Sequence, residues 1–248
     1  MIIKIIYHNF INIMKRFLIL SLAILYSCTY PKMTRDELVY ENDFEDEILT
    51  EIDGGTISVY NNTKVLGNYN NDAFTLHLNN LGSYDYVYVS FDLYIHGSWD
   101  GNSNGFNMQD HGYEDKPDLW GMELRPEMGS YQALDFHRYE TTFSNSPCWP
   151  DYCKRQSYPN TFPHDNNPKA GADKKNLIQN CISDGWNNEK TSLYKIEKGF
   201  DHQGDALVLR FYDKLFQPNA IDFFGENIEK CDESWSLDNL KVRVISYD

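Results

Sequence analysis

Apolar and polar residues alternate along several short segments of the chain, and this alternation predicts β-strands. The clearest segment is YVYVSFDLYI, residues 86–95, whose apolar members fall on one face of a strand while Tyr, Ser and Asp fall on the other. Further strands are predicted at residues 56–60, 73–78, 119–124, 131–136, 192–200, 206–213, 219–224 and 235–245. Many short strands joined by turns predict an all-β fold, a β-sandwich or jelly roll.

The alternation stops between Ser144 and Lys190, where Pro, Asn, Asp, Gly and Cys are frequent. This composition predicts a long loop with a short helix near 174–180, and long loops on a rigid scaffold are common places for function. We expect disulfides to pin this loop. The cysteines concerned are Cys148, Cys153, Cys181 and Cys231. They allow three pairings, of which we favour Cys148–Cys153, because CWPDYC contains a Pro turn, together with Cys181–Cys231. The alternative is that one or both pairs stay reduced.

The composition fits a folded, acidic protein. Of 248 residues, 41% are hydrophobic and 15% aromatic, which is enough for a core. The formal net charge is −15, from 22 Lys+Arg against 37 Asp+Glu. The sequence shows no basic footprint, which argues against nucleic-acid binding, and the acidity suits cation binding better.

The first residues have the pattern of an export signal. Lys15 and Arg16 precede an apolar run of about ten residues, which is short for a membrane span and typical of a secretory signal. The segment LYSC, residues 25–28, resembles the lipobox of bacterial lipoproteins. The resemblance implies a signal peptide at 1–27, with Met14 as a possible true start. It also implies lipidation of Cys28, a tether at 28–40 and a place in the bacterial envelope, at the outer membrane or cell surface. The alternatives are an ordinary secretory peptide or an uncleaved anchor.

Three segments of the predicted domain, residues 41–248, carry a second resemblance. They are DFED at 43–46, SFDLYIHGSWDGN at 90–102 and DESWSLDNLKV at 232–242. Their layout resembles exported bacterial proteins with concanavalin-A-like or jelly-roll sandwiches, and it is similar to MAM domains. The resemblance implies a surface, adhesive or carbohydrate-binding module.

The same resemblance implies a structural calcium ion between the first and last strands. It would bring Glu45 close to Asp238, with Asp43 or Asn239 as further oxygen donors. Ca²⁺ takes six to eight oxygen ligands, so a cluster of carboxylates suits it. The alternative is that these side chains are solvated, or that Asp238 caps a turn.

A second candidate calcium loop follows the clearest strand. DGNSNG, residues 100–105, matches the opening of a calcium loop, with Asp100, Asn102 and Asn104 as alternate ligands. His111 occupies the twelfth position, where an EF-hand needs Glu, and no flanking helices are predicted, which argues against an EF-hand. A different loop, closed by Asp110, Asp115 or Asp118, remains open, as does a plain turn.

Tryptophans are the candidate glycan contacts, because an aromatic face can stack on a sugar ring. The candidates are Trp149, Trp186, Trp99 and Trp120. Core packing is the alternative, above all for Trp99.

The sequence carries no catalytic motif that we would assign. ENDFE at 41–45 has the E-x-D-x-E spacing of retaining glucanases, but it precedes the first strand predicted by alternation, and we interpret it as coincidence. We therefore expect a non-enzymatic, calcium-stabilised surface lipoprotein that binds a glycan or surface protein. The alternatives are a polysaccharide-degrading enzyme and a purely structural envelope protein.

Overall fold

The computed structural model describes residues 30–103, 116–125, 137–145, 148, 153–181, 190–215, 217 and 227–248. These residues form a main body, 35–246, and a small terminal unit. Within the terminal unit, the amide of Asp248 donates to the carbonyl oxygen of Lys32 at 2.9 Å. Within these described ranges, no helix combines the length and hydropathy of a membrane span.

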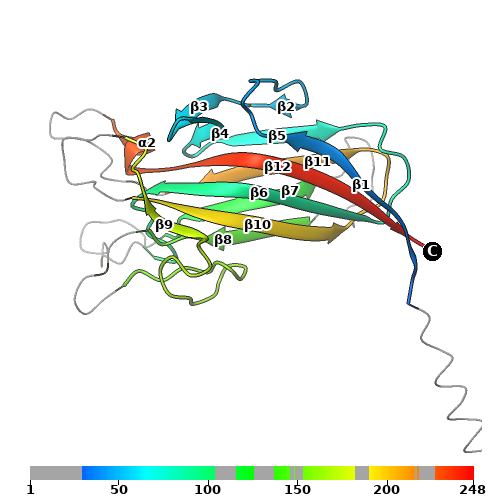
Figure 1. The fold of residues 1–248 in the computed structure, drawn as a ribbon. Coiled ribbons are helices and arrows are strands. Elements are labelled where there is room, and N and C mark those ends of the chain that lie inside the picture. The colour runs from blue at the N-terminus through cyan, green and yellow to red at the C-terminus, as the bar shows by residue number, and fades with distance from the viewer. Residues whose placement is uncertain are drawn as a thin grey trace, which may run out of the picture. The chain divides into compact units, whose positions relative to one another are not determined.

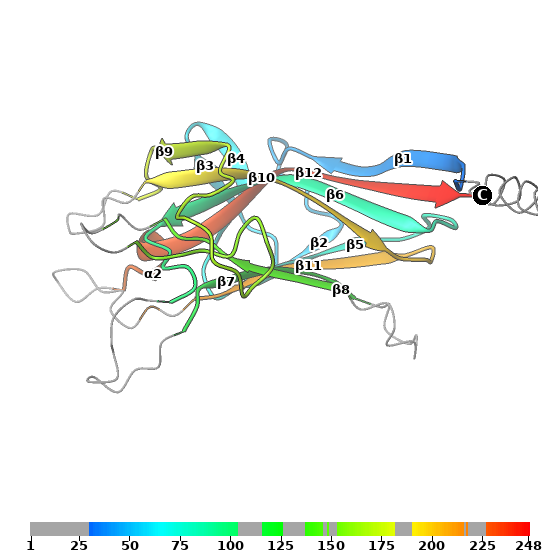
Figure 2. The ribbon, with the colours of Figure 1, turned by 90° about the horizontal axis from the view of Figure 1, so that it is seen from below.

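The strands form two antiparallel sheets, which Figure 2 shows as separate layers. The strands of the larger sheet are β1 (Met33–Asn42), β3 (Ile57–Tyr60), β4 (Thr63–Tyr69), β6 (Tyr86–Gly97), β9 (Lys174–Leu177), β10 (Thr191–Asp201) and β12 (Glu233–Tyr247). Those of the smaller sheet are β2 (Ile52–Asp53), β5 (Ala73–Leu78), β7 (Leu119–Arg125), β8 (His137–Thr142) and β11 (Leu207–Lys214). One short helix, α2 (Glu229–Asp232), immediately precedes β12 (Figure 1).

The larger sheet has the order β3-β4-β12-β6-β10-β9, and β1 pairs with β12 as well. The smaller sheet has the order β2-β5-β11-β7-β8. The prediction of an all-β sandwich is confirmed. The two sheets bury a core rich in aromatic rings, because apolar residues at alternate positions of strands such as β5 and β6 turn inward. On β6 these residues are Val87, Val89, Phe91, Leu93 and Ile95, as the alternation predicts.

Both favoured disulfides are present, Cys148–Cys153 and Cys181–Cys231. One local prediction is wrong. Residues 174–177 form strand β9 instead of a helix, because they pair with β10. The tether at 28–40 stays a prediction. Its residues 33–40 belong to β1, which pairs with β12 while its side chains stay largely exposed. The predicted strands at 131–136 and 219–224 lie outside the described residues, as does the signal segment 1–27 with Cys28.

Candidate metal centre

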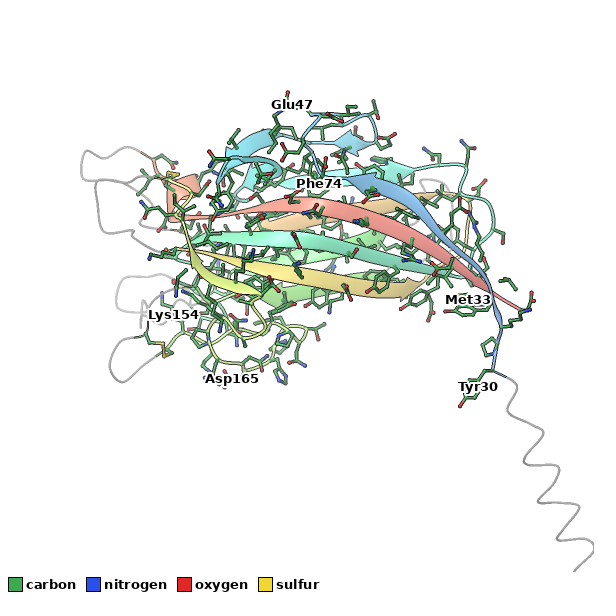
Figure 3. The ribbon with its side chains drawn as sticks, in the orientation of Figure 1. Tyr30, Met33, Glu47, Phe74, Lys154 and Asp165 are labelled. Carbon is green, nitrogen blue, oxygen red and sulfur yellow. A yellow bond between two sulfur atoms is a disulfide. The ribbon has the colours of Figure 1, made fainter. Side chains whose placement is uncertain are left out.

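Three segments that are distant in sequence meet at the end of the sandwich where β6 finishes and β12 begins. Gly97, the last residue of β6, pairs with Glu233, the first residue of β12. The segment after β6 contacts the described part of the long loop, since the amide of Asn102 donates to the carbonyl oxygen of Arg155 at 2.8 Å. Helix α2 and Lys154 lie at this end of the molecule (Figures 1 and 3).

Glycine is required at the turn that leaves β6. Gly97 has a φ of +78°, and a Cβ there would lie 1.8 Å from the carbonyl oxygen of Asp232. The close approach lets Ser98 donate its amide to that same oxygen at 2.7 Å. The backbone therefore holds the residue before Trp99 against the residue before Glu233.

Three carboxylates converge on this turn. Asp100, Asp118 and Glu233 each offer an oxygen, and these oxygens lie within 4.8 Å of one another. Asp118 and Glu233 are buried, and Asp100 is half-buried. The amide of Asp100 donates to Asp118 Oδ2 at 2.6 Å, which fixes the Asp118 side chain under the loop.

One cation is close to the group. Lys154 forms an ion pair with Asp100 Oδ1, and both side chains are largely shielded from solvent. Glu233 Oε2 differs from the other oxygens, because it is buried and no donor among the described residues bonds to it. Burial, and then the charges of Asp118, Asp100 and Asp232, raise the pKa of Glu233 well above its usual value, while Lys154 opposes the shift.

The arrangement suits a hard cation. The three carboxylates and the Lys154 ammonium carry a formal charge of about −2 together, which one divalent ion would neutralise. All three ligand groups are carboxylates, the ligands that Ca²⁺, Mg²⁺ and Mn²⁺ prefer over softer metals. The group could therefore hold a metal ion.

The structure brings the predicted calcium group of Glu45 and Asp238 into electrostatic range. Asp238 is 6% exposed, and burial together with the charges of Asp92, Glu45 and Asp43 raises its pKa to about 6. Each carboxylate also has local partners, for Glu45 Oε1 accepts from Lys64 N at 3.1 Å and Asp238 Oδ1 accepts from Asn239 N at 2.7 Å. These acids are not among the converging groups found in the described ranges, so calcium here stays a prediction.

A surface pocket of about 550 Å³ lies beside the group of Glu45 and Asp238. Its wall includes Tyr40, Asn42, Asp43, Glu51, Asn239 and Lys241. The amide nitrogen of Asn42 donates to Tyr40 Oη at 3.2 Å and to the carbonyl oxygen of Ile48 at 2.8 Å, so both side chains are held in place.

The structure also describes the surroundings of three other predicted site residues, Asn102, Trp99 and Trp120. The carbonyl oxygen of the Asn102 side chain accepts from Thr142 Oγ1 at 2.5 Å and from Ser157 Oγ at 2.8 Å. This oxygen therefore lies against two hydroxyl groups, and a cation would have to compete with them for it. Trp99 and Trp120 are fully buried, so neither presents a ring face to a sugar. Asn104, Trp149 and Trp186 lie outside the described residues.

Sequence reasoning missed Glu233 and Lys154. Asp118 was one of three open choices for closing the loop, and the structure places it beside Asp100. No local signal distinguishes Glu233 from its neighbours in DESWS, because only the pairing of β6 with β12 carries it to the loop. Lys154 follows Cys153 directly, so the cysteine pattern was the available pointer to it.

The described residues therefore define a two-sheet antiparallel β-sandwich with two disulfides and a buried acidic group. No model of a known protein family matches the sequence, and no curated protein matches it. Among solved structures, the crystal structure of a non-crystalline cellulose specific carbohydrate-binding module, CBM28, is similar. The identity is 13%, covering 86% of this chain and 94% of that chain, with a TM-score of 0.34. The strand pairing and the contacts above, and not this similarity, carry the fold and the site.

Proposed function

We propose that the chain is an exported, lipid-anchored protein whose sandwich binds a neutral glycan in the pocket beside Tyr40. The observation that supports the proposal is the pocket itself. Its volume of about 550 Å³ is in the range of small-ligand sites. Tyr40 supplies an aromatic surface, and the amides and carboxylates around it can bond the hydroxyls of a sugar ring.

The charge of the pocket selects among glycans. Its wall carries four carboxylates, those of Glu41, Asp43, Asp46 and Glu51, against the single ammonium of Lys241. That ammonium is paired with Glu41 Oε1 at 2.6 Å. An anionic glycan would be repelled, so the proposed ligand is neutral.

A glycan array probed with the full chain in mild detergent tests this function. We expect retention of neutral oligosaccharides, and loss of that retention in Tyr40→Ala. The matched control is Tyr88→Ala, since Tyr88 is a half-buried tyrosine outside the pocket wall. An array without neutral hits, or a Tyr40→Ala variant that binds as the wild type does, would reject the proposal.

The anchor is tested separately. The lipobox-like segment ending at Cys28 supports lipidation and a place on the bacterial envelope. Expression with a labelled fatty acid should label the wild type and leave Cys28→Ser unlabelled, with the variant released from the membrane fraction. Equal labelling of both would remove the anchor and leave the glycan proposal intact.

One observation favours polysaccharide hydrolysis as a second function. Asp238 directly precedes Asn239, which lines the pocket, and burial together with the charges of Asp92 and Glu45 raises its pKa to about 6. A carboxyl with a raised pKa beside a ligand pocket is what a general acid requires. Release of reducing sugar from a retained glycan by the wild type, but not by Asp238→Asn, would establish the enzyme. Retention without any release would establish a binding protein.

A further inference from the structure

The buried carboxyl of Glu233 lacks a compensating partner. Glu233 is 3% exposed, and its Oε2 has no hydrogen-bond partner among the described residues. A buried carboxylate without a partner is strongly unfavourable, so such a group usually has a counter-ion or a ligand. An oxygen of Glu233 lies within 4.8 Å of oxygens of Asp100 and Asp118, so the carboxyl is aimed into the acidic group.

Lys154 does not neutralise the group. Its ammonium pairs with Asp100 Oδ1, on the half-buried side of the site. One ammonium set against three carboxylates leaves a formal charge of about −2 on the group. A divalent cation is the simplest partner for the buried Oε2 of Glu233, which has no hydrogen-bond donor among the described residues.

We propose that Asp100, Asp118 and Glu233 bind one divalent cation of the Ca²⁺ class, which fastens the loop after β6 to the first residue of β12. The spacing fits, because two oxygens on one Ca²⁺ lie at most about 5 Å apart, twice the Ca–O bond. Ca²⁺ takes six to eight ligands, so water fills the positions that three carboxylates leave. The partly exposed Asp100 side gives the ion and its water a way in, since the Asp100 and Lys154 side chains are 19% and 15% exposed.

Covalent and backbone contacts prepare the site in advance. Cys231, two residues before Glu233, is bonded to Cys181, and Cys153, just before Lys154, is bonded to Cys148. Asp118 donates its amide to the carbonyl oxygen of Gly101 at 3.0 Å. These contacts hold the ligand segments in place before a cation binds. Less conformational entropy is then lost on binding, which favours it.

Terbium luminescence and equilibrium dialysis on the full chain in detergent test the proposal. Tb³⁺ replaces Ca²⁺ at oxygen sites, and Trp99, next to Asp100 in sequence, can sensitise its emission. We expect sensitised emission that Ca²⁺ displaces, and one Ca²⁺ bound per chain. A Ca²⁺ concentration of about 100 times Kd should raise the Tm by roughly 5–10 °C.

Glu233→Gln is the decisive variant. Loss of a ligand charge should weaken Ca²⁺ binding by roughly 100-fold or more. The same change puts a neutral amide of equal size where burial and the neighbouring acids disfavour a charge, so the Tm without Ca²⁺ should not fall at neutral pH. Loss of Ca²⁺ binding without a loss of Tm separates a cation ligand from a merely structural residue, and it does not require a destabilised variant to fold.

Glu37→Gln is the matched control, because Glu37 is an exposed carboxylate that pairs with Arg35 and belongs to neither acidic group. It should leave both the emission and the Tm shift unchanged. The absence of Ca²⁺-displaceable emission in the wild type, or unchanged binding in Glu233→Gln, would overturn the proposal. Loss of binding in Glu45→Gln alone would move the cation to the Asp238 group. None of these outcomes depends on glycan binding, which involves the Tyr40 pocket.

Discussion

The indole Nε1 of Trp99 donates a hydrogen bond to the carbonyl oxygen of Ser234 at 3.0 Å. The bond joins the residue before Asp100 to the residue after Glu233. Trp99 is fully buried and packs against Phe143 with ring centroids 6.1 Å apart. The two segments that carry the acidic group are therefore joined through the core whether or not a cation is present.

Replacing Trp99 by Phe should damage both stability and the cation site. The change leaves the Ser234 carbonyl oxygen buried without its donor, which costs about 1–3 kcal/mol of unfolding free energy. Because the segments of Asp100 and Glu233 are then less closely held, Ca²⁺ affinity should fall as well. Urea unfolding measures the first effect, and dialysis with Ca²⁺ measures the second.

Trp235→Phe is the control for this variant. Trp235 is equally buried, and its Nε1 donates to Asp213 Oδ1 at 2.9 Å, away from the acidic group. It should lose stability while keeping the affinity for Ca²⁺. If both variants retain full affinity, the Trp99 contact does not position the site.

The two disulfides should differ in their contribution to stability. Cys181–Cys231 closes a separation of 50 residues, and Cys148–Cys153 closes one of 5. The entropy of loop closure in the unfolded chain predicts losses of about 4 and about 2 kcal/mol when each pair is replaced by Ser. Urea unfolding under non-reducing conditions gives both values. An equal or larger loss from the shorter loop would show that native contacts, rather than chain entropy, dominate.

Gly97→Ala should unfold the start of β12. An alanine there combines a φ of +78° with a Cβ 1.8 Å from the carbonyl oxygen of Asp232, and a backbone oxygen cannot swing aside. We expect a loss of about 3 kcal/mol or more. Gly82→Ala is the control, since Gly82 has a φ of +70° but only the end of the Arg35 side chain nearby, at 3.6 Å. It should lose about 1–2 kcal/mol from backbone strain alone. Equal losses would mean that the loop relaxes away from Asp232.

His96 should make the fold sensitive to acid. It is buried between Thr191 Oγ1 at 2.9 Å and Ser236 Oγ at 2.7 Å, and burial lowers its pKa to about 3. The folded protein keeps His96 neutral while the unfolded chain takes up a proton near pH 6.5. The contribution of neutral His96 to the free energy of unfolding is therefore fully present above pH 6.5. It is lost as the pH falls towards 3, at up to about 1.4 kcal/mol per pH unit.

His96→Gln, which keeps a donor and an acceptor, should remove this part of the acid sensitivity. The measurement is the free energy of unfolding of the variant and the wild type between pH 7 and pH 4. As the pH falls, the free energy of unfolding of the wild type should decrease more steeply than that of the variant. The control is His77→Gln, whose side chain is 41% exposed. A gap that stays constant with pH would show that His96 is protonated in the folded protein or is not desolvated.

The sequence predicts the sandwich well where one strand face is buried. Apolar and polar residues alternate over 86–95, and the observed strand β6 covers this segment and only two residues more, ending at Gly97. Strand β1 was not predicted, because its side chains stay largely exposed. Its stabilisation comes from backbone pairing, which produces no alternation of apolar and polar residues in the sequence. Strand β9, KKNL, is short and polar and carries no periodic signal at all.

The acidic site was predictable only in part, for a related reason. Asp100 was found because turn residues follow a strong strand, and Asp118 lay among the candidates for closing its loop. Glu233 joins them through the pairing of β6 with β12, which links opposite parts of the chain and depends on global topology. Trp99 misled for the opposite reason: a tryptophan beside a polar loop suggests an exposed ring, while long-range packing buries it completely.

The Lys154 ammonium should compete with a bound ion for the Asp100 carboxylate, because the two side chains form an ion pair. Lys154→Met should strengthen Ca²⁺ binding by roughly tenfold, since the site then carries one more uncompensated negative charge. The same change should lower the Tm without Ca²⁺, for the carboxylates lose the cation that balances them. Titration with Ca²⁺ followed by terbium displacement measures the first effect, and thermal unfolding in EDTA measures the second. Lys214→Met is the matched control. Lys214 lies at the end of β11 and pairs with Glu140 Oε1 of β8 at 3.3 Å, so this variant should change neither the Ca²⁺ affinity nor the Tm in EDTA. Weaker Ca²⁺ binding in Lys154→Met would mean that the ammonium positions Asp100 for the ion instead of competing with it.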